Sequence, residues 1–582
     1  MFLCYHFFLV FLFVPVHSLT LYFLKPGHAT AEDLVKAIKN EMTDLNARDL
    51  LQISMDGPAV NLKVFNIFKG ELERDFGHLL IDIGSCGLHT LHNAFQSGES
   101  KSGWDLANIL KSLYYLFKDA PARKEDYLSC AGAGQLMPQK FVSHRWLENV
   151  PVCKRAILIW SCIEKYVEKV NQKEFMKPTS RSYETVSNAV RDKLVCVKLE
   201  FFCLVASILL PFLTNYQSDK PLVPFLAADL AEIIRCLMKR FIKSEIIDTA
   251  NTCEKLCGID ILNKENHSIY SKIDIGLAAE EKLKGVGCSD KQIMEFKMQC
   301  KEFLIGVLKK MLEKSPMKYS VVRNMACLDP RAMANDRSKC RNDFRNLMKH
   351  LISIKRIDSD SAETVLRQYE LFLESIPALG TELFSGFSPV QEKGVDTFLA
   401  EKLSDTMYAE LFTTVKMFLI VSHGQATVER GFSVNKKVEV ENLRHQSLVA
   451  QRIICDFVKE TGSIFNVPIT NQLLVSVASA RQKYETYLET ERQEKKSVDE
   501  CRKRKHVLEE IEGMKKRRKQ VEMDMEHLEN SADSLCEKAE STGALKFVAE
   551  ANACRHKAKE KKNLLSELND KINQTVESLK NN

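Results

Sequence analysis

Proline and glycine are scarce in this sequence: its 582 residues include only 15 prolines and 23 glycines. Such a shortage favours long helices over a sheet-rich architecture. Zinc-binding pairs are scarce too, because the 18 cysteines are scattered and never occur as CxxC. This pattern argues against a structural zinc site and against a dense disulfide framework, and it favours reduced cysteines that serve as small hydrophobic residues.

Charge is absent from the N-terminus. No charged residue precedes Lys25, and Phe7–Val14 is continuously apolar. A signal peptide normally has a positive region before its apolar run, and Pro15, His17 and Ser18 leave the run short for a spanning helix. Residues 1–24 are therefore interpreted as an apolar leader. It is either signal-like or a segment that replaced a lost upstream coding region.

The excess positive charge is local. The chain has a formal charge of +6, and residues 502–519 hold nine basic residues against three glutamates, a surplus of six. Two basic runs nine residues apart are typical of a bipartite nuclear-import signal, and such runs also attract phosphate backbones. A solvated helix face is the alternative. The nine residues are Arg502, Lys503, Arg504, Lys505, Lys515, Lys516, Arg517, Arg518 and Lys519. Nuclear localisation follows, with the secretory pathway or a membrane, reached through residues 1–24, as the alternative.

With 45% hydrophobic residues, the chain is long enough for two to four domains. The first part alternates like an α/β unit and predicts a mixed or parallel sheet. Its predicted strands are Leu19–Leu24, Leu50–Met55 and His78–Ile83, and its helix is Thr30–Met42 with Thr30 as N-cap. Residues 101–376 show helical periodicity throughout. The clearest segments there are Leu106–Phe117, Arg155–Val170, Val195–Phe212 and Ile293–Lys314.

After a linker at Ile376–Gly394, helical character returns at Gly394–Phe418 and Gln446–Val458. Residues 471–582 repeat apolar residues at spacings of four and three, which predicts a coiled coil. The repeat stops at Ser541–Gly543, so an antiparallel hairpin of two arms is expected. Its predicted facing groups are Met525, Leu528 and Leu535 on one arm and Phe547, Ala551 and Cys554 on the other.

Chemistry-bearing residues occur in four places. Asp56 ends an apolar strand at a Gly-Pro turn, where metal-dependent nucleases place a ligand, although an Asx turn explains it more simply. Cys86 and His89 form a CxxH pair, which is too small for a metal site by itself. Arg145-Trp146 and Glu429 are uninformative when taken singly.

Taken in order, these segments resemble the hAT superfamily of transposases. ISMDGPAVN (53–61) is similar to the segment with the second catalytic acid, and CGLH (86–89) to the family's CxxH motif. SHRWLENV (143–150) resembles its arginine–tryptophan segment. SHGQATVERGFS (422–433) is similar to the terminal block with the catalytic glutamate and the dimerisation helices. The resemblance covers about residues 19–458.

The resemblance implies an RNase H-like core interrupted by a helical insertion, in which two Asp and one Glu hold two divalent metals. Asp56 would be the second acid and Glu429 the third. The first acid belongs on an upstream strand, but no Asp or Glu precedes Glu32. We therefore expect vestigial catalytic residues, no occupied metal site and no enzymatic activity.

The expected fold is mostly α with a small α/β part. It comprises the leader (1–24), a truncated RNase H-like core (25–100), a large helical insertion (101–376), a catalytic-Glu and dimerisation segment (377–470) and a coiled-coil tail (471–582). The expected function is that of a non-catalytic, transposase-derived nuclear protein. Its partners would be a second copy and DNA, with no small-molecule substrate, cofactor or membrane. Two alternatives stay open: an active transposase that uses Mg²⁺ and an acid from elsewhere, and a coiled-coil scaffold without a DNA role.

Overall fold

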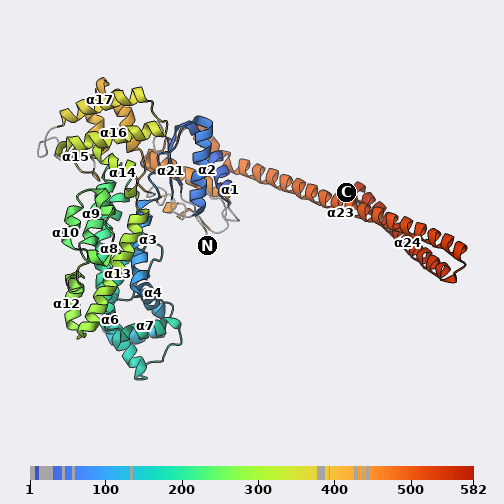
Figure 1. The fold of residues 1–582 in the computed structure, drawn as a ribbon, viewed down its shortest axis with the longest axis horizontal. Helices are drawn as coiled ribbons and strands as arrows, with labels where there is room; N and C mark the ends of the chain where they lie inside the picture. The colour runs from blue at the N-terminus through green and yellow to red at the C-terminus, as the bar shows by residue number, and fades with distance from the viewer. Residues whose placement is uncertain are drawn as a thin grey trace. The chain divides into compact units, whose positions relative to one another are not determined.

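The computed structural model describes residues 7–11, 30–41, 46–55, 59–131, 136–376, 387–391, 393–424, 430, 433–434, 437–438, 440 and 445–581. The described chain is mostly helical, which confirms the predicted class. It divides into two compact units, Met1–Ile454 and Cys455–Asn582. The first unit holds the sheet and most of the core, and the second holds the tail (Figure 1).

The sheet of the first unit has two strands. The predicted strand Leu50–Met55 is confirmed as β2, and its six residues are all buried. β1 (Phe7–Phe11) pairs with it in antiparallel register, with Phe7 opposite Met55. β1 thus lies inside the segment predicted as a leader. The predicted strand Leu19–Leu24 falls outside the described residues.

The third predicted strand, His78–Ile83, is wrong as a regular strand. The segment follows β2 only loosely: the Ile81 amide donates to the Leu51 carbonyl over 2.9 Å, and the Cys86 amide donates to Met55 over 3.2 Å. Its other backbone groups bond elsewhere, because the Leu79 amide donates to the Ile354 carbonyl and the Leu79 carbonyl accepts from Arg356.

Arg356 joins the helical part of the first unit to this sheet. Its guanidinium donates to the Leu79 carbonyl over 2.8 Å, to the Arg48 carbonyl over 3.3 Å and also to the Leu50 carbonyl. Burial lowers the pKa of Arg356 to about 10, so the group stays charged at neutral pH. One side chain thereby ties its own segment to Arg48–Leu50 at the start of β2 and to the segment that contains Leu79.

The helices next to the sheet begin where the sequence indicates. The Thr30 hydroxyl accepts from the Asp33 amide over 3.2 Å, and the Asp33 carboxylate accepts from the Thr30 amide over 3.0 Å, so Thr30 caps the first helix as predicted. The helices of this part are α1 (Ala31–Glu41), α2 (Ala59–Phe76), α3 (Gly87–Ser102), α4 (Leu106–Phe117) and α5 (Pro121–Ala131), with the short η1 (Ala47–Asp49) before β2.

The described residues of the region predicted as a helical insertion are mostly helical, with loops between the helices and one isolated β-bridge between Ile242 and His267. Figure 1 shows its helices stacked in a column, with α16 and α17 at one end and α6 and α7 at the other. Its longer helices are α6 (Val150–Asn171), α7 (Arg181–Arg191), α8 (Val195–Tyr216), α9 (Val223–Met238), α12 (Leu277–Gly285), α13 (Asp290–Lys314), α16 (Arg337–Ser353) and α17 (Ser359–Ser375). Its shorter elements are η2 (Trp146–Asn149), α10 (Ser244–Thr249), α11 (Cys253–Cys257), η3 (Lys264–Asn266), η4 (Tyr270–Lys272), η5 (Pro316–Lys318), α14 (Ser320–Asn324), η6 (Met325–Leu328) and α15 (Pro330–Asn335).

Aromatic side chains form the centre of this column. Phe95 of α3 meets Phe202 and Phe303 edge-on, with ring centroids 4.6 and 5.3 Å apart. α8 is long and apolar enough to cross a membrane by length and composition. In this fold it is a core helix, because Phe201, Phe202 and Leu209 are fully buried.

The backbones of α3 and α13 touch at two glycines. A Cβ added at Gly306 would lie 2.8 Å from the Gly98 Cα and 2.8 Å from the Ser97 carbonyl oxygen. A Cβ added at Gly98 would lie 2.7 Å from the Phe303 carbonyl oxygen. Only glycine allows so close an approach at either position. This crossing fixes α3, which starts at the CxxH pair.

The chain after the column is again helical, as predicted. Its elements are α18 (Val395–Lys402), η8 (Thr406–Tyr408), α19 (Ala409–Leu419), α21 (His445–Glu460), η9 (Ile464–Asn466) and α22 (Asn471–Ala478). Much of the predicted linker, and most of 425–444, lie outside the described residues.

The second unit contains the predicted helical hairpin. α23 (Ala480–Thr542) ends at Gly543, whose φ of 65° turns the chain, and α24 (Leu545–Asn581) packs back along it. The predicted apolar seam is confirmed, since its positions are buried or half-buried. The fully buried ones are Ile511, Val521, Ala532, Ala551, Ala558, Leu568 and Ile572.

Polar pairs across the hairpin set its register. Lys561 pairs with Asp524 over 2.9 Å, Arg555 pairs with Asp533 over 3.6 Å, and Arg518 donates to Asn569 over 3.3 Å. The predicted facing of Met525 and Phe547 is therefore wrong, because Met525 follows Asp524 and lies beside Lys561. Apolar spacing defines a seam, but the alignment of two arms also depends on the tightness of the turn and on which charges meet.

Candidate functional site

Gln52 joins strand β2 to the block at residues 422–433. Its side-chain amide donates to the Ser422 carbonyl over 3.1 Å, and its side-chain oxygen accepts from the Ser422 amide over 2.7 Å. The side chain is buried, so both of its polar atoms need such partners. Two segments 370 residues apart in sequence are thus bonded directly to each other.

The CxxH pair lies at the same place. The Cys86 amide donates to the Met55 carbonyl at the end of β2. A Cβ added at Gly424 would lie 3.6 Å from Leu88 and 3.7 Å from the Cys86 sulfur, so Gly424 is in ordinary contact with the CGLH segment. The end of β2, the start of α3 and Ser422–Gly424 therefore meet at one point.

The arginine–tryptophan segment is attached to α3 through His92. The Leu147 amide donates to His92 Nδ1 over 3.3 Å. Burial first, and then the nearby His89, Arg145 and His144, lower the pKa of His92 to about 4. His92 is therefore neutral at physiological pH, and its Nδ1 carries no proton.

Asn149 holds the arginine–tryptophan segment in shape. The side chain is fully buried, accepts from the Val142 amide over 2.7 Å, and donates to three carbonyls over 3.0 to 3.1 Å. The three carbonyls belong to Val142, Arg145 and Trp146. Trp146 packs its buried ring edge-on against Phe141, and the Arg145 side chain is partly exposed and pairs with Glu148 over 3.0 Å.

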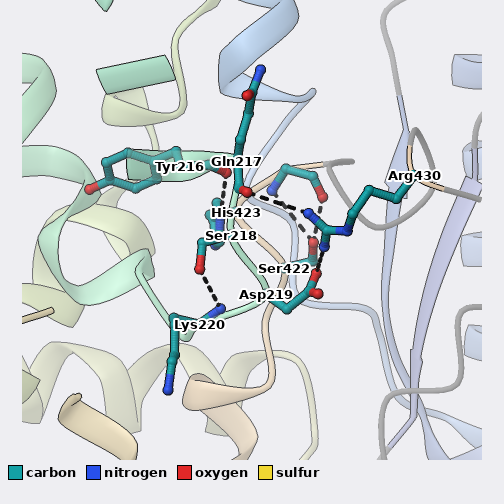
Figure 2. A network of polar contacts seen from close by, with 9 residues as sticks. Tyr216, Gln217, Ser218, Asp219, Lys220, Ser422, His423 and Arg430 are labelled. Atoms are coloured by element: carbon teal, nitrogen blue, oxygen red, sulfur yellow. Dashed lines mark hydrogen bonds and ion pairs between the residues drawn. The ribbon is translucent and has the colours of Figure 1, made fainter. Parts of the chain in front are cut away.

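The block at 422–433 is also anchored to the end of α8 (Figure 2). His423 is buried and its Nε2 lies 3.0 Å from the Tyr216 carbonyl oxygen. Because a carbonyl only accepts, Nε2 carries the proton of the neutral ring. Burial lowers the pKa of His423 to about 4. Arg430 donates to the Gln217 carbonyl over 3.4 Å and pairs with Asp219.

Asp56 and Glu429, the two acids that the resemblance singles out, lie outside the described residues. The described residues nearest to them in sequence do lie together: Met55 bonds to Cys86, and Gly424 contacts Cys86. Proximity of the two carboxylates stays a prediction. The described part of the chain contains no group of three or more His, Cys, Asp or Glu side chains arranged to hold a metal ion.

The nine basic residues of the tail all lie on α23. Eight of them are exposed, and Arg518 is half-buried in the seam. Lys516 pairs with Glu512 along the same helix over 3.7 Å. The two basic runs thus stay accessible within the hairpin, as an import signal requires.

The sequence interpretation overlooked the residues that join these segments. Gln52, His92, Asn149 and His423 are all buried polar groups with partners in another segment or a neighbouring loop. Gln52 alone left a signal, since it is the one side-chain amide in a mostly apolar strand. The other three have the polarity of ordinary surface residues, so their burial could not be deduced locally.

No family model matches the chain, and no curated protein matches it. The resemblance to hAT transposases therefore depends on the four sequence segments.

Proposed function

We propose that this chain is a non-catalytic nuclear protein derived from a hAT-superfamily transposase, and that it acts by associating with a second copy and with DNA. In this proposal the first unit is a truncated RNase H-like core with a helical insertion. The hairpin is a coiled coil that carries the nuclear-import signal.

One observation carries the proposal: three of the four segments of the resemblance meet at the end of β2, and the arginine–tryptophan segment is attached to α3, which starts there. Gln52 bonds to Ser422, Cys86 bonds to Met55, and Leu147 bonds to His92 six residues after Cys86. Four motifs matched by chance would have no reason to be joined in a chain of 582 residues. A shared catalytic core supplies that reason, because its acids must reach the same pair of metals.

Loss of catalysis follows from the missing acid. β1, the strand paired with β2, reads Phe-Phe-Leu-Val-Phe and provides no carboxylate beside the end that precedes Asp56. Removing one of three acids removes about a third of the charge that binds the metals. Since those ions stabilise the transition state, strand cleavage should be lost with them.

Self-association is supported by α21, which lies in the segment similar to the family's dimerisation region. This helix exposes Ile453, Ile454 and Phe457, with 57%, 62% and 48% of each residue open to solvent. Adjacent exposed apolar side chains of this size are typical of a protein interface.

The test combines sedimentation velocity with a nicking assay. The wild type should sediment as a dimer or larger, and Ile454→Asn/Phe457→Ser should shift it to the monomer. Leu158→Asn/Leu277→Asn is the matched control, since these residues are 65% and 80% exposed in other helices. A wild type that stays monomeric at high concentration would contradict self-association. Mg²⁺- or Mn²⁺-dependent DNA nicking that disappears in Asp56→Asn would establish the active-transposase alternative.

A further inference from the structure

A basic stripe runs along α16. Arg337, Arg341, Arg345 and Lys349 occur at intervals of four residues and are exposed. Four residues exceed one helical turn by about 40°, so the row winds gradually around α16 while it advances about 6 Å per step along the axis. Ser338, Asn342 and Asn346 lie beside them with the same spacing.

The charge of α16 departs from that of its surroundings. With Lys339, the helix has five basic residues, and Asp343 is its one acid, a formal surplus of four. The chain outside residues 502–519 is close to neutral. The overall composition therefore does not indicate this stripe. It is indicated only by the four-residue spacing and by the exposure of the basic side chains.

Another face of α16, which adjoins Arg337 and Arg341 and lies away from Lys349, is fixed in the core. Its buried residues are Cys340, Phe344, Leu347, Met348 and Leu351. Phe344 stacks on Tyr369 of α17 with ring centroids 3.8 Å apart. The helix therefore presents its basic side outward from a rigid support, at the end of the column where α16 and α17 lie (Figure 1).

Half of the stripe is unengaged within the described chain. Arg341 pairs with Glu370 of α17 over 3.3 Å, and Arg337 donates to the Ile376 carbonyl. No ion pair or side-chain hydrogen bond to a described residue is recorded for Arg345 or Lys349. These two cations are free to bind an external anion.

We infer that the exposed face of α16 binds the phosphate backbone of double-stranded DNA. A row of cations about 6 Å apart can reach every second phosphate along a duplex strand, since each phosphate advances about 3.4 Å. The neighbouring Ser and Asn side chains add neutral donors of the kind that contact phosphate oxygens. A membrane surface fits less well, because the apolar side of α16 is buried and cannot insert among lipids.

The inference rests on the proposed function only in taking DNA as a partner. It assigns contacts with DNA to α16 as well as to the tail. The test is fluorescence anisotropy of a labelled duplex of about 30 base pairs, titrated with the full chain at several salt concentrations. Each phosphate contact contributes about 0.9 to the slope of the logarithm of the association constant against the logarithm of the salt concentration. At about 0.1 M salt, one contact therefore strengthens binding about eightfold.

Arg345→Gln/Lys349→Gln should therefore weaken binding roughly 60-fold at about 0.1 M salt and lower the slope by about two. The matched control is Lys154→Gln/Lys165→Gln, which removes two exposed lysines of α6 at the other end of the column. The control should change affinity by less than about threefold and leave the slope unchanged. Equal loss in the two variants would show a general charge effect and overturn the inference.

Glu370→Gln provides a test in the opposite direction. It frees Arg341 without touching the stripe, so duplex affinity should rise, while Glu313→Gln on α13 should leave it nearly unchanged. An affinity that falls or stays constant in Glu370→Gln would contradict the inference. A wild type that binds anionic vesicles as tightly as it binds duplex DNA would also contradict the inference.

The outcomes separate this inference from the proposed function. If Arg345→Gln/Lys349→Gln dimerises and binds DNA as tightly as the wild type, the proposed function stands but α16 has no part in DNA binding. A chain that dimerises but binds no duplex at low salt would overturn the inference and the DNA role together. Arg345→Gln/Lys349→Gln should unfold at the wild-type midpoint, because the two changed side chains are exposed.

Discussion

Replacing Gly306 by alanine tests the crossing that fixes α3. Alanine favours a helix interior over glycine by about 1 kcal/mol. At this position its methyl group would lie 2.8 Å from the Gly98 Cα and 3.1 Å from the Gly98 nitrogen. These are backbone atoms that cannot rotate away, and moving a packed helix costs about 1–3 kcal/mol. The packing term should win, with a net loss of up to about 2 kcal/mol in the free energy of unfolding.

Urea unfolding followed by tryptophan fluorescence measures this loss. All three tryptophans, Trp104, Trp146 and Trp160, lie in the first unit, so the signal reports on that unit alone. Gly70→Ala is the matched control, because Gly70 lies inside α2 with no atom within 4 Å of an added Cβ. It should stabilise the protein by about 0.5–1 kcal/mol. A Gly306→Ala protein at least as stable as Gly70→Ala would refute the reasoning.

Three further predictions concern the sheet anchor, pH and import. Arg356→Leu should destabilise the first unit by about 2–4 kcal/mol, since it leaves two part-buried carbonyls and one exposed carbonyl without their charged donor; a loss below about 1 kcal/mol in urea unfolding would contradict this. His92 and His423 have folded pKa values near 4, below the ordinary 6.5. The two neutral histidines therefore contribute fully to the free energy of unfolding above about pH 6.5. This contribution, up to about 3 kcal/mol for each histidine, is lost as the pH falls toward 4. The unfolding midpoint of His92→Gln/His423→Gln should depend less on pH over that range, and an unchanged dependence would count against the assignment. Alanines at Lys515–Lys519 should leave a tagged protein in the cytoplasm, whereas an unchanged nuclear signal, or a glycosylated secreted wild type, would tell against the import signal.

The sequence was sufficient wherever local pattern decides the structure. β2, the cap at Thr30, the helix Leu106–Phe117 and the tail seam were all predictable, because burial of a periodic apolar face determines them. His78–Ile83 was not, since Arg356, almost 280 residues away, takes the backbone groups that a strand would use. The register of the hairpin also depends on pairs such as Asp524–Lys561 that no spacing rule fixes.

The candidate site was likewise predictable from the sequence only in part. Motif order predicted that the segments around Asp56, Cys86, Trp146 and Glu429 belong together. The contacts that join them come from Gln52, His92 and His423, whose roles depend on long-range burial. Such contacts leave no periodic trace in a single sequence.

The distance between residues 56 and 429 tests the central claim most directly. Spin labels introduced at both positions through unnatural amino acids avoid the 18 native cysteines. In a site built around two metals about 3.5–4 Å apart, the two side chains should lie within about 10 Å of each other. The labels should then broaden each other's spectra strongly. A separation beyond about 25 Å would place the two acids in different sites and contradict descent from a transposase core.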